Sequence, residues 1–134
     1  MNLFVDTSVW SLALRRDESG DQRVVRRLRD ALDGGDSVFT TGLVLQELLQ
    51  GFRGPKARDA ILDRFASLPL LIPDRADHVQ AAELRNACRR SGIQVGTIDV
   101  LLAQLCVRHD LVMLSADQDF TLMAPHVGLA NWKP

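Results

Sequence analysis

Lysine and aromatic residues are scarce in this chain, and tyrosine is absent. Lys56 and Lys133 are the only lysines among 16 basic residues, so nearly all of the positive charge is carried by arginine. Receiver domains and haloacid-dehalogenase-like phosphatases need an active-site lysine after a late strand, and neither lysine stands at such a place. Aromatic residues make up 5% of the chain, and Trp10 and Trp132 suit packing as well as base stacking, so no base-reading surface is identified.

The residue patterns that mark several common sites are also missing. Cys88 and Cys106 lie in helix-like stretches without metal-ligand spacing, and we expect both to be buried, reduced thiols. The three histidines are scattered along the chain, which argues against a zinc site. No Gly-x-Gly-x-x-Gly follows a strand, which argues against dinucleotide binding.

The chain has neither a long apolar run nor an excess of one charge. No window approaches the ~20 apolar residues of a membrane span, and the N-terminus lacks the pattern of a secretory signal, so we expect a cytoplasmic protein without membrane contact. Sixteen basic and 17 acidic residues leave a net charge of −1, so a nucleic-acid partner would have to be recognised locally. A length of 134 residues fits one domain, residues 1–134.

Short apolar runs alternate with helical patterns along the chain. The helical patterns carry apolar residues at three- and four-residue spacing, and Thr97 is the expected N-cap of a late helix over residues 98–109. Such alternation, with fully apolar strands, predicts an α/β fold whose parallel sheet is covered on both faces. The predicted strands are residues 3–5, 37–40, 68–72 and 111–114, with a weaker fifth at 127–130, and the earlier helices are 7–14, 22–32, 43–49, 55–65 and 74–90.

Acidic residues occur where the predicted strands end. Asp6 and Asp117 follow the first and fourth strands, and Glu47 lies early in the helix after the second strand, so all three should gather at the carboxyl edge of the sheet. Asp99 starts a helix that precedes a strand, so it reaches this edge only if the helix over residues 74–90 crosses the sheet and returns the chain. Asp119 follows Asp117 by two residues and would point away from it on a regular helix, so we favour Asp117 over Asp119.

Several carboxylates in one crevice repel one another unless a cation lies between them. Oxygen ligands without histidine or cysteine favour Mg²⁺, or Mn²⁺, and such sites hold phosphates for phosphodiester hydrolysis. Two of the acids also have an alternative, purely structural use. Asp6 could be a helix N-cap, and Asp99 a first-turn acid that the helix dipole favours.

Four segments of the chain together resemble PIN-domain ribonucleases, in particular the VapC-type toxins of bacterial toxin–antitoxin pairs. The resemblance covers the whole chain and implies a PIN-like α/β/α sandwich with a central parallel sheet of four to five strands. It also implies that folding brings Asp99 into the site. Gln104 stands where the family often has a small residue, and we expect this to be a packing variation. The segments are LFVDTSVW at residues 3–10, VLQEL at 44–48, GTIDVLLA at 96–103 and LSADQDF at 114–120.

By position, the resemblance assigns an acidic catalytic quartet and its supporting residues. It implies a metal-dependent endoribonuclease with Mg²⁺ or Mn²⁺ as cofactor, a VapB-type antitoxin that inserts an arginine into the acidic crevice, and a toxin homodimer. The apolar residues 43–49 and 61–65 could supply the dimer surface. The quartet is Asp6, Glu47, Asp99 and Asp117; the metal ligands are Asp6, Asp99 and Asp117, with Glu47 and Asp119 as further candidates; and the supporting polar residues are Thr7, Ser8 and Ser115.

Two questions stay open at the level of sequence. The chain could instead be a PIN-like module that only binds RNA or protein, or a housekeeping RNA-processing nuclease. An arginine-rich segment could contact an RNA backbone, or it could be a solvated helix face paired with neighbouring acids. The candidate RNA contacts in this segment are Arg15, Arg16, Arg23 and Arg27.

Overall fold

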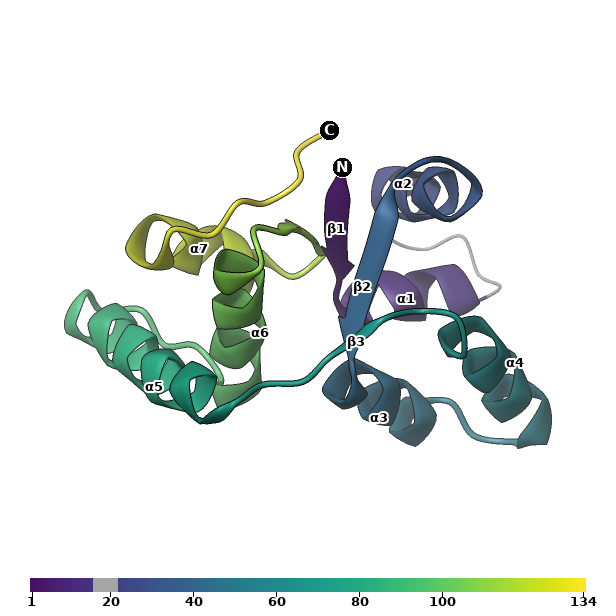
Figure 1. Cartoon of the computed structure of the whole chain (residues 1–134), viewed down its shortest axis with the longest axis horizontal. Helices are drawn as coiled ribbons and strands as arrows, with labels where there is room; N and C mark the ends of the chain where they lie inside the picture. Colours follow the sequence, from purple (N-terminus) through teal and green to yellow (C-terminus); the bar gives the residue numbers. More distant parts are fainter. Residues whose placement is uncertain (16–21) are drawn as a thin grey trace.

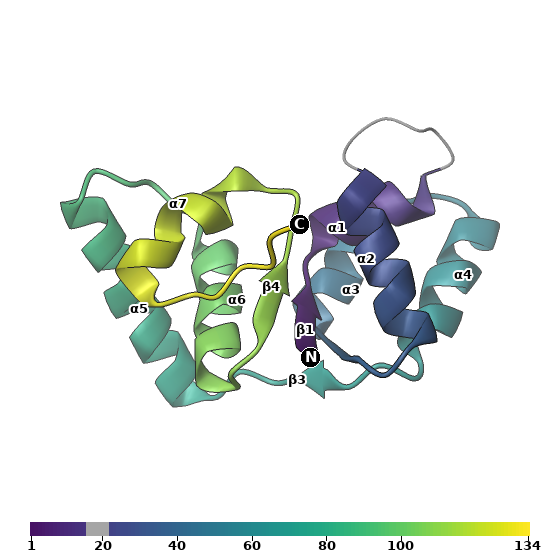
Figure 2. The ribbon, with the colours of Figure 1, turned by 90° about the horizontal axis from the view of Figure 1, so that it is seen from above.

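The computed structural model describes residues 1–15 and 22–134, and these form a layered α/β fold (Figure 1). Helices α1 to α4 lie on one side of the sheet and α5 to α7 on the other (Figures 1 and 2). The strands are β1 (Asn2–Val5), β2 (Ser37–Thr41), β3 (Leu70–Leu71) and β4 (Val112–Leu114). The helices are α1 (Thr7–Leu14), α2 (Gln22–Asp33), α3 (Gly42–Gly51), α4 (Pro55–Phe65), α5 (Arg75–Arg90), α6 (Thr97–Arg108) and α7 (Gln118–Val127).

The four strands form a parallel sheet in the order β3-β2-β1-β4. Leu3 in β1 pairs with Val38 in β2 and with Val112 in β4, so β1 lies between two neighbours. Leu3, Phe4 and Val5 are fully buried, as expected for a strand covered on both faces. The predicted α/β fold with a parallel sheet is therefore confirmed.

Helix α6 lies in the core of the molecule. All residues from Val100 to Cys106 are buried, because the helix lies between the sheet and the helices α5 and α7. Cys106 and Cys88 are both free and buried, which confirms the expectation from sequence. Among the described residues, no helix is both long enough and apolar enough to cross a membrane.

Two local predictions are wrong. Residues 127–130 form no strand, because α7 continues to Val127 and ends at Gly128, whose backbone is left-handed with φ 73°. Only a single bridge, between Met113 and Asn131, extends the sheet at this edge. The N-cap of α6 is Gly96 rather than Thr97, and it makes no side-chain capping bond.

A buried carboxylate joins α5 to α6. Asp77 is 1% exposed and accepts hydrogen bonds from the Asp74 amide over 2.9 Å, from Gln104 Nε2 over 3.3 Å and from Arg108. Burial raises the pKa of Asp77, but these three donors outweigh it and hold the pKa below its ordinary value. Gln104 is therefore a polar link between two helices and not the expected packing variation.

Candidate metal centre

The junction of β1 and α1 fixes the most buried acid. Asp6 follows the last residue of β1 and is 5% exposed. As the N-cap of α1 it accepts a 3.4 Å hydrogen bond from the Val9 amide. The capping role considered from sequence is therefore real, and it holds the carboxylate at the carboxyl end of the central strand.

Two serine hydroxyls hold the Asp6 carboxylate. Ser8 Oγ donates to Asp6 Oδ1 over 2.6 Å, and Ser115 Oγ donates to Asp6 Oδ2 over 2.7 Å. Each hydroxyl has one proton, and both protons go to the carboxylate, an arrangement suited to its ionised form. Ser8 also accepts from the Ala116 amide over 2.9 Å, so the end of β1 is tied to the turn after β4.

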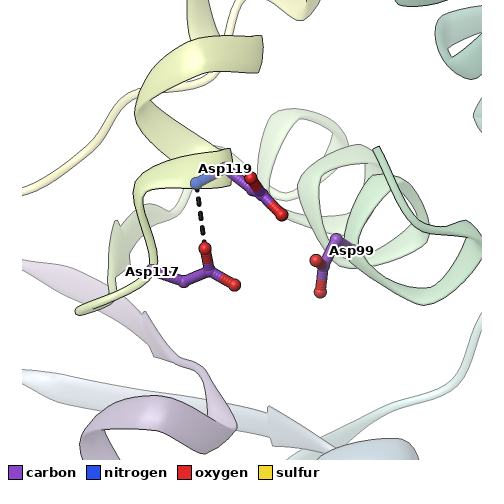
Figure 3. A group of neighbouring side chains, drawn as sticks. All are labelled: Asp99, Asp117 and Asp119. Carbon is purple, nitrogen blue, oxygen red and sulfur yellow. Dashed lines mark hydrogen bonds between the residues drawn. The ribbon is translucent and has the colours of Figure 1, made fainter. Parts of the chain in front are cut away.

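The start of α7 brings a pair of acids to the same place. Asp117 is the N-cap of α7, and its Oδ1 accepts a 2.9 Å bond from the Asp119 amide (Figure 3). Because Asp117 lies outside the helix with an extended backbone, the rule for residues two apart on a helix does not apply to this pair. The prediction that Asp119 points away from Asp117 is therefore wrong. The signal that could have shown this is the position of Asp117 itself, an N-cap residue type just before the helix.

The start of α6 places Asp99 opposite this pair. Helix α5 packs along the outer side of α6, and the loop after it returns the chain so that α6 begins at the end where α7 also begins (Figure 2). Among the described residues, Asp99, Asp117 and Asp119 each offer one carboxylate oxygen, and these oxygens all lie within 4.8 Å of one another (Figure 3). Asp99 therefore reaches the acidic crevice in the way that the sequence left undecided.

Glu47 lies on α3 and is half-buried. Its Oε1 accepts a 2.9 Å hydrogen bond from Thr7 Oγ1, so the residue next to Asp6 orients it. The three polar residues Thr7, Ser8 and Ser115 thus each donate a hydrogen bond to an acid of the predicted quartet.

The acids share one electrostatic environment. Burial, followed by the charges of the neighbouring acids, raises the pKa of Asp99 to about 6. Those neighbours are Asp117, Asp6, Asp119 and Glu47. Burial also raises the pKa of Asp6, and the serine hydrogen bonds offset this only in part. The other three acids of the predicted quartet, together with Asp119, therefore lie within electrostatic reach of Asp99.

The donor set fits a hard divalent cation. The three clustered carboxylates supply oxygen ligands only, and their mutual repulsion is the unfavourable energy that a cation would remove. Asp6 is not part of this closest group, and both of its oxygens accept hydrogen bonds from serines. The assignment of Asp6 and Glu47 as metal ligands stays a prediction.

The predicted RNA contacts are spread over different environments. Arg15 is exposed at the end of α1, and Arg16 lies outside the described residues. Arg27 Nη1 forms a 2.8 Å ion pair with Asp36, which also binds the N-terminal amine at 2.9 Å. Arg27 therefore lies where β1 begins, at the opposite end of the strand from Asp6, and its placement argues against a contact at the acidic cluster.

The fold is similar to those of several solved toxin structures. A chain in the VapBC complex of Rickettsia felis, bound to a promoter DNA fragment, shares 18% identity at a TM-score of 0.73, with 99% of this chain and 100% of that chain covered. FitAcB of Neisseria gonorrhoeae shares 21% at a TM-score of 0.74, covering 98% and 97%. A VapC toxin of Mycobacterium tuberculosis that cleaves the sarcin–ricin loop shares 22% at a TM-score of 0.71, covering 98% and 99%.

At these identities the likeness concerns the fold alone. No curated protein matches the chain. The profile of the PIN domain family, however, matches residues 3–124, a span that includes Asp6, Glu47, Asp99 and both acids at the start of α7. The chain belongs to the PIN domain family.

Proposed function

We propose that this protein is a Mg²⁺- or Mn²⁺-dependent endoribonuclease that acts in the cytoplasm as the VapC-type toxin of a toxin–antitoxin pair. The observation that carries the proposal is the convergence of Asp99, Asp117 and Asp119 within 4.8 Å, beside the buried Asp6. The family match and the similarity of the fold to VapC-type toxins support it.

The chain's own residues divide the work at the site. Asp99, Asp117 and Asp119 would hold the cation, with Asp6 and Glu47 as further ligands or as acceptors for its bound water. A cation bound there supplies Lewis acidity, which activates water and stabilises the leaving oxygen of a phosphodiester. Ser8 and Ser115 hold Asp6 in place, and Thr7 orients Glu47. This preorganisation keeps the carboxylates at the positions that a phosphate and its cation require.

A toxin role requires a protein partner that neutralises it. Another structure of similar fold, VapBC-5 of Mycobacterium tuberculosis, is a member of the VapBC family of toxin–antitoxin systems. For this chain we propose a VapB-type antitoxin that presents an arginine to the acidic crevice, because a guanidinium pairs bidentately with carboxylates. A homodimer is also part of the proposal, and of the two segments expected to form its surface, residues 43–49 keep partly exposed apolar side chains whereas residues 61–65 do not offer their two largest ones. Ile61 and Phe65 are buried in the core and cannot form it.

Cleavage of RNA by the purified full chain tests the activity. We expect cleavage with Mg²⁺ or Mn²⁺, none with a chelator, and none from Asp6→Asn or Asp99→Asn, both of which should remain folded. Asp63→Asn, which changes an exposed acid on α4, is the matched control and should cleave like the wild type. Cleavage at the wild-type rate by either site variant would contradict the assignment of the site, and RNA binding without cleavage would favour a non-catalytic module.

Expression in cells tests the toxin role separately. We expect induction to arrest growth and co-expression of a small neighbouring gene to relieve the arrest. Mapping of RNA 5′ ends after brief induction would identify the cleaved RNA. An active nuclease whose induction leaves growth unchanged would instead indicate a housekeeping RNA-processing enzyme.

A further inference from the structure

A basic hollow lies beside the loop that leads into α6. It has a volume of about 240 Å³ and is lined by Arg85, Arg89, Ile93, Gln94 and Val95. No acidic residue lines it, whereas the acidic cluster begins four residues farther along the chain, at Asp99. The hollow thus combines two guanidinium groups and a side-chain amide, which are the donors that a phosphate group accepts from.

The structure positions one of these arginines firmly. Arg85 is half-buried, and its Nε donates to the Val95 carbonyl over 2.9 Å, which ties α5 to the loop. Neither Arg85 nor Arg89 forms an ion pair with any acid in the described ranges 1–15 and 22–134, unlike Arg27 and Arg108. The terminal amino groups of Arg85 therefore keep their donors for a ligand.

The two arginines also repel each other. They are four residues apart on α5, so their side chains lie on the same face of the helix, where like charges are destabilising. The same face carries His78 and Ala82, which line a second hollow of about 230 Å³ that shares Arg85 with the first. An anion between the guanidinium groups would remove the repulsion.

The hollow lies at the correct end of the molecule to act with the acidic cluster. The loop between α5 and α6 lies at the end of the fold where α6 and α7 begin (Figure 2). Val95 and Asp99 are four residues apart, so their Cα atoms are within about 14 Å of each other. A single RNA strand that places one phosphate at the acids can therefore place a nearby phosphate in the hollow.

We propose that the hollow formed by Arg85, Arg89 and Gln94 binds a backbone phosphate of the RNA strand, beside the phosphate that is cleaved. The proposal rests on the proposed ribonuclease function and names a substrate-positioning site for it. Contacts of this kind fix the register of a strand without reading its bases. The hollow also explains how a protein of nearly neutral net charge attracts RNA, since its positive charge is concentrated next to the crevice that needs it.

Arg89→Ala against Arg90→Ala is the matched test. Both residues are exposed arginines in the last turn of α5, and both complement the helix dipole, but only Arg89 lines the hollow. We expect Arg89→Ala to raise the KM for a single-stranded RNA oligonucleotide roughly three- to tenfold with kcat nearly unchanged, and Arg90→Ala to have little effect. Arg85→Lys, which keeps the charge but loses the Nε bond to Val95, should be intermediate.

Two further measurements separate a phosphate contact from a structural effect. In a full chain made inactive by Asp99→Asn, Arg89→Ala should lower the slope of log affinity against log salt by about 0.7, as expected for one lost phosphate contact to a single strand. For a dinucleotide substrate, which is too short to reach the hollow, Arg89→Ala should leave cleavage unchanged.

The outcomes distinguish a failure of the phosphate site from a failure of the ribonuclease function. Equal losses in Arg89→Ala and Arg90→Ala, or no loss in either, would overturn the phosphate site while leaving the ribonuclease intact. An equal loss on the dinucleotide would also overturn it, because the variant would then act through the fold. A wild-type chain that cleaves no RNA under any metal condition would overturn the proposed function, and the RNA assignment of the hollow with it.

Discussion

Ser115, in the turn after β4, donates its hydroxyl proton over 2.7 Å to Asp6 at the end of β1, which is 109 residues earlier in the chain. The same hydroxyl oxygen accepts a 2.9 Å bond from the Asp117 amide. One side chain thus links the buried Asp6 to the loop that carries the exposed Asp117. The relative positions of these acids depend on this link.

Replacing Ser115 by alanine should weaken both the fold and the site. Asp6 would lose one of its two hydroxyl donors, and we expect a loss of about 1.5–3 kcal/mol in the free energy of unfolding, measured with urea. The pKa of Asp6 should rise further, because burial would be less compensated. Ser67→Ala, at an exposed serine, is the control. Equal stability of the two variants would contradict a structural role for the Ser115 bond.

Asp99→Asn should stabilise the metal-free protein while removing its response to metal. The substitution deletes a charge that four neighbouring acids repel, so the free energy of unfolding at neutral pH should increase. We expect an increase of only about 1 kcal/mol, because solvent screens the charge of a half-buried group. In thermal unfolding, Mg²⁺ should raise the Tm of the wild type but not of the variant. A Mg²⁺-induced rise of similar size in Asp99→Asn would place the cation elsewhere.

Asp99 and Asp6 should both make the metal-free protein less stable as pH rises. The pKa of Asp99 is raised from 3.8 to about 6, so the folded state holds its proton more tightly, and the metal-free protein should lose stability as pH rises from about 4 to above 6. Asp6, whose pKa is also raised, adds to this trend. Saturating Mg²⁺ should flatten the profile in this window. Identical urea-unfolding profiles with and without Mg²⁺ would contradict a shared site.

Asp77→Asn should destabilise the contact between α5 and α6. The variant removes the charge that pairs with Arg108 and places an amide N–H group against one of the donors that Asp77 now accepts from. We expect the free energy of unfolding to fall by about 2 kcal/mol. The loss is no larger because water can solvate the partly exposed Arg108. Because the pKa of Asp77 is lowered in the folded state, its contribution is complete above the unfolded value near 4 and is lost as pH falls through the lower folded value. Glu83→Gln, at an exposed acid on the same helix, is the control, and matching losses would refute the network's role.

Much of the site follows from local patterns and one topological rule. Asp6 and Asp117 each come after an apolar strand, and the carboxyl ends of parallel strands meet at one edge of a sheet. These two positions, and that of Glu47 in the second turn of the helix after β2, could be predicted because each depends only on neighbouring residues and strand direction. The same is true of the buried cysteines, which lie within strongly apolar helical stretches.

Other features depended on contacts that are distant in the sequence. Asp99 reaches the site because α5 packs along α6 and the loop after α5 brings the start of α6 to the end where α7 begins (Figure 2). Gln104 looked like a packing variation because its partner, Asp77, is 27 residues away. The helical pattern also did not indicate that Arg27 pairs with Asp36, at the end of the sheet away from the acids.

The sequence by itself determined the layered α/β fold and the identity of the acids, because hydrophobic periodicity and chain direction are local properties. Only the tertiary structure decided which carboxylates lie within 4.8 Å, which serines hold Asp6, and where two unpaired arginines form a hollow beside the acids. The preference for arginine over lysine suits such a hollow. Arg85 is held through Nε by the Val95 carbonyl while its two terminal amino groups stay in a fixed plane for a phosphate, whereas a lysine would have to make both contacts from a single nitrogen.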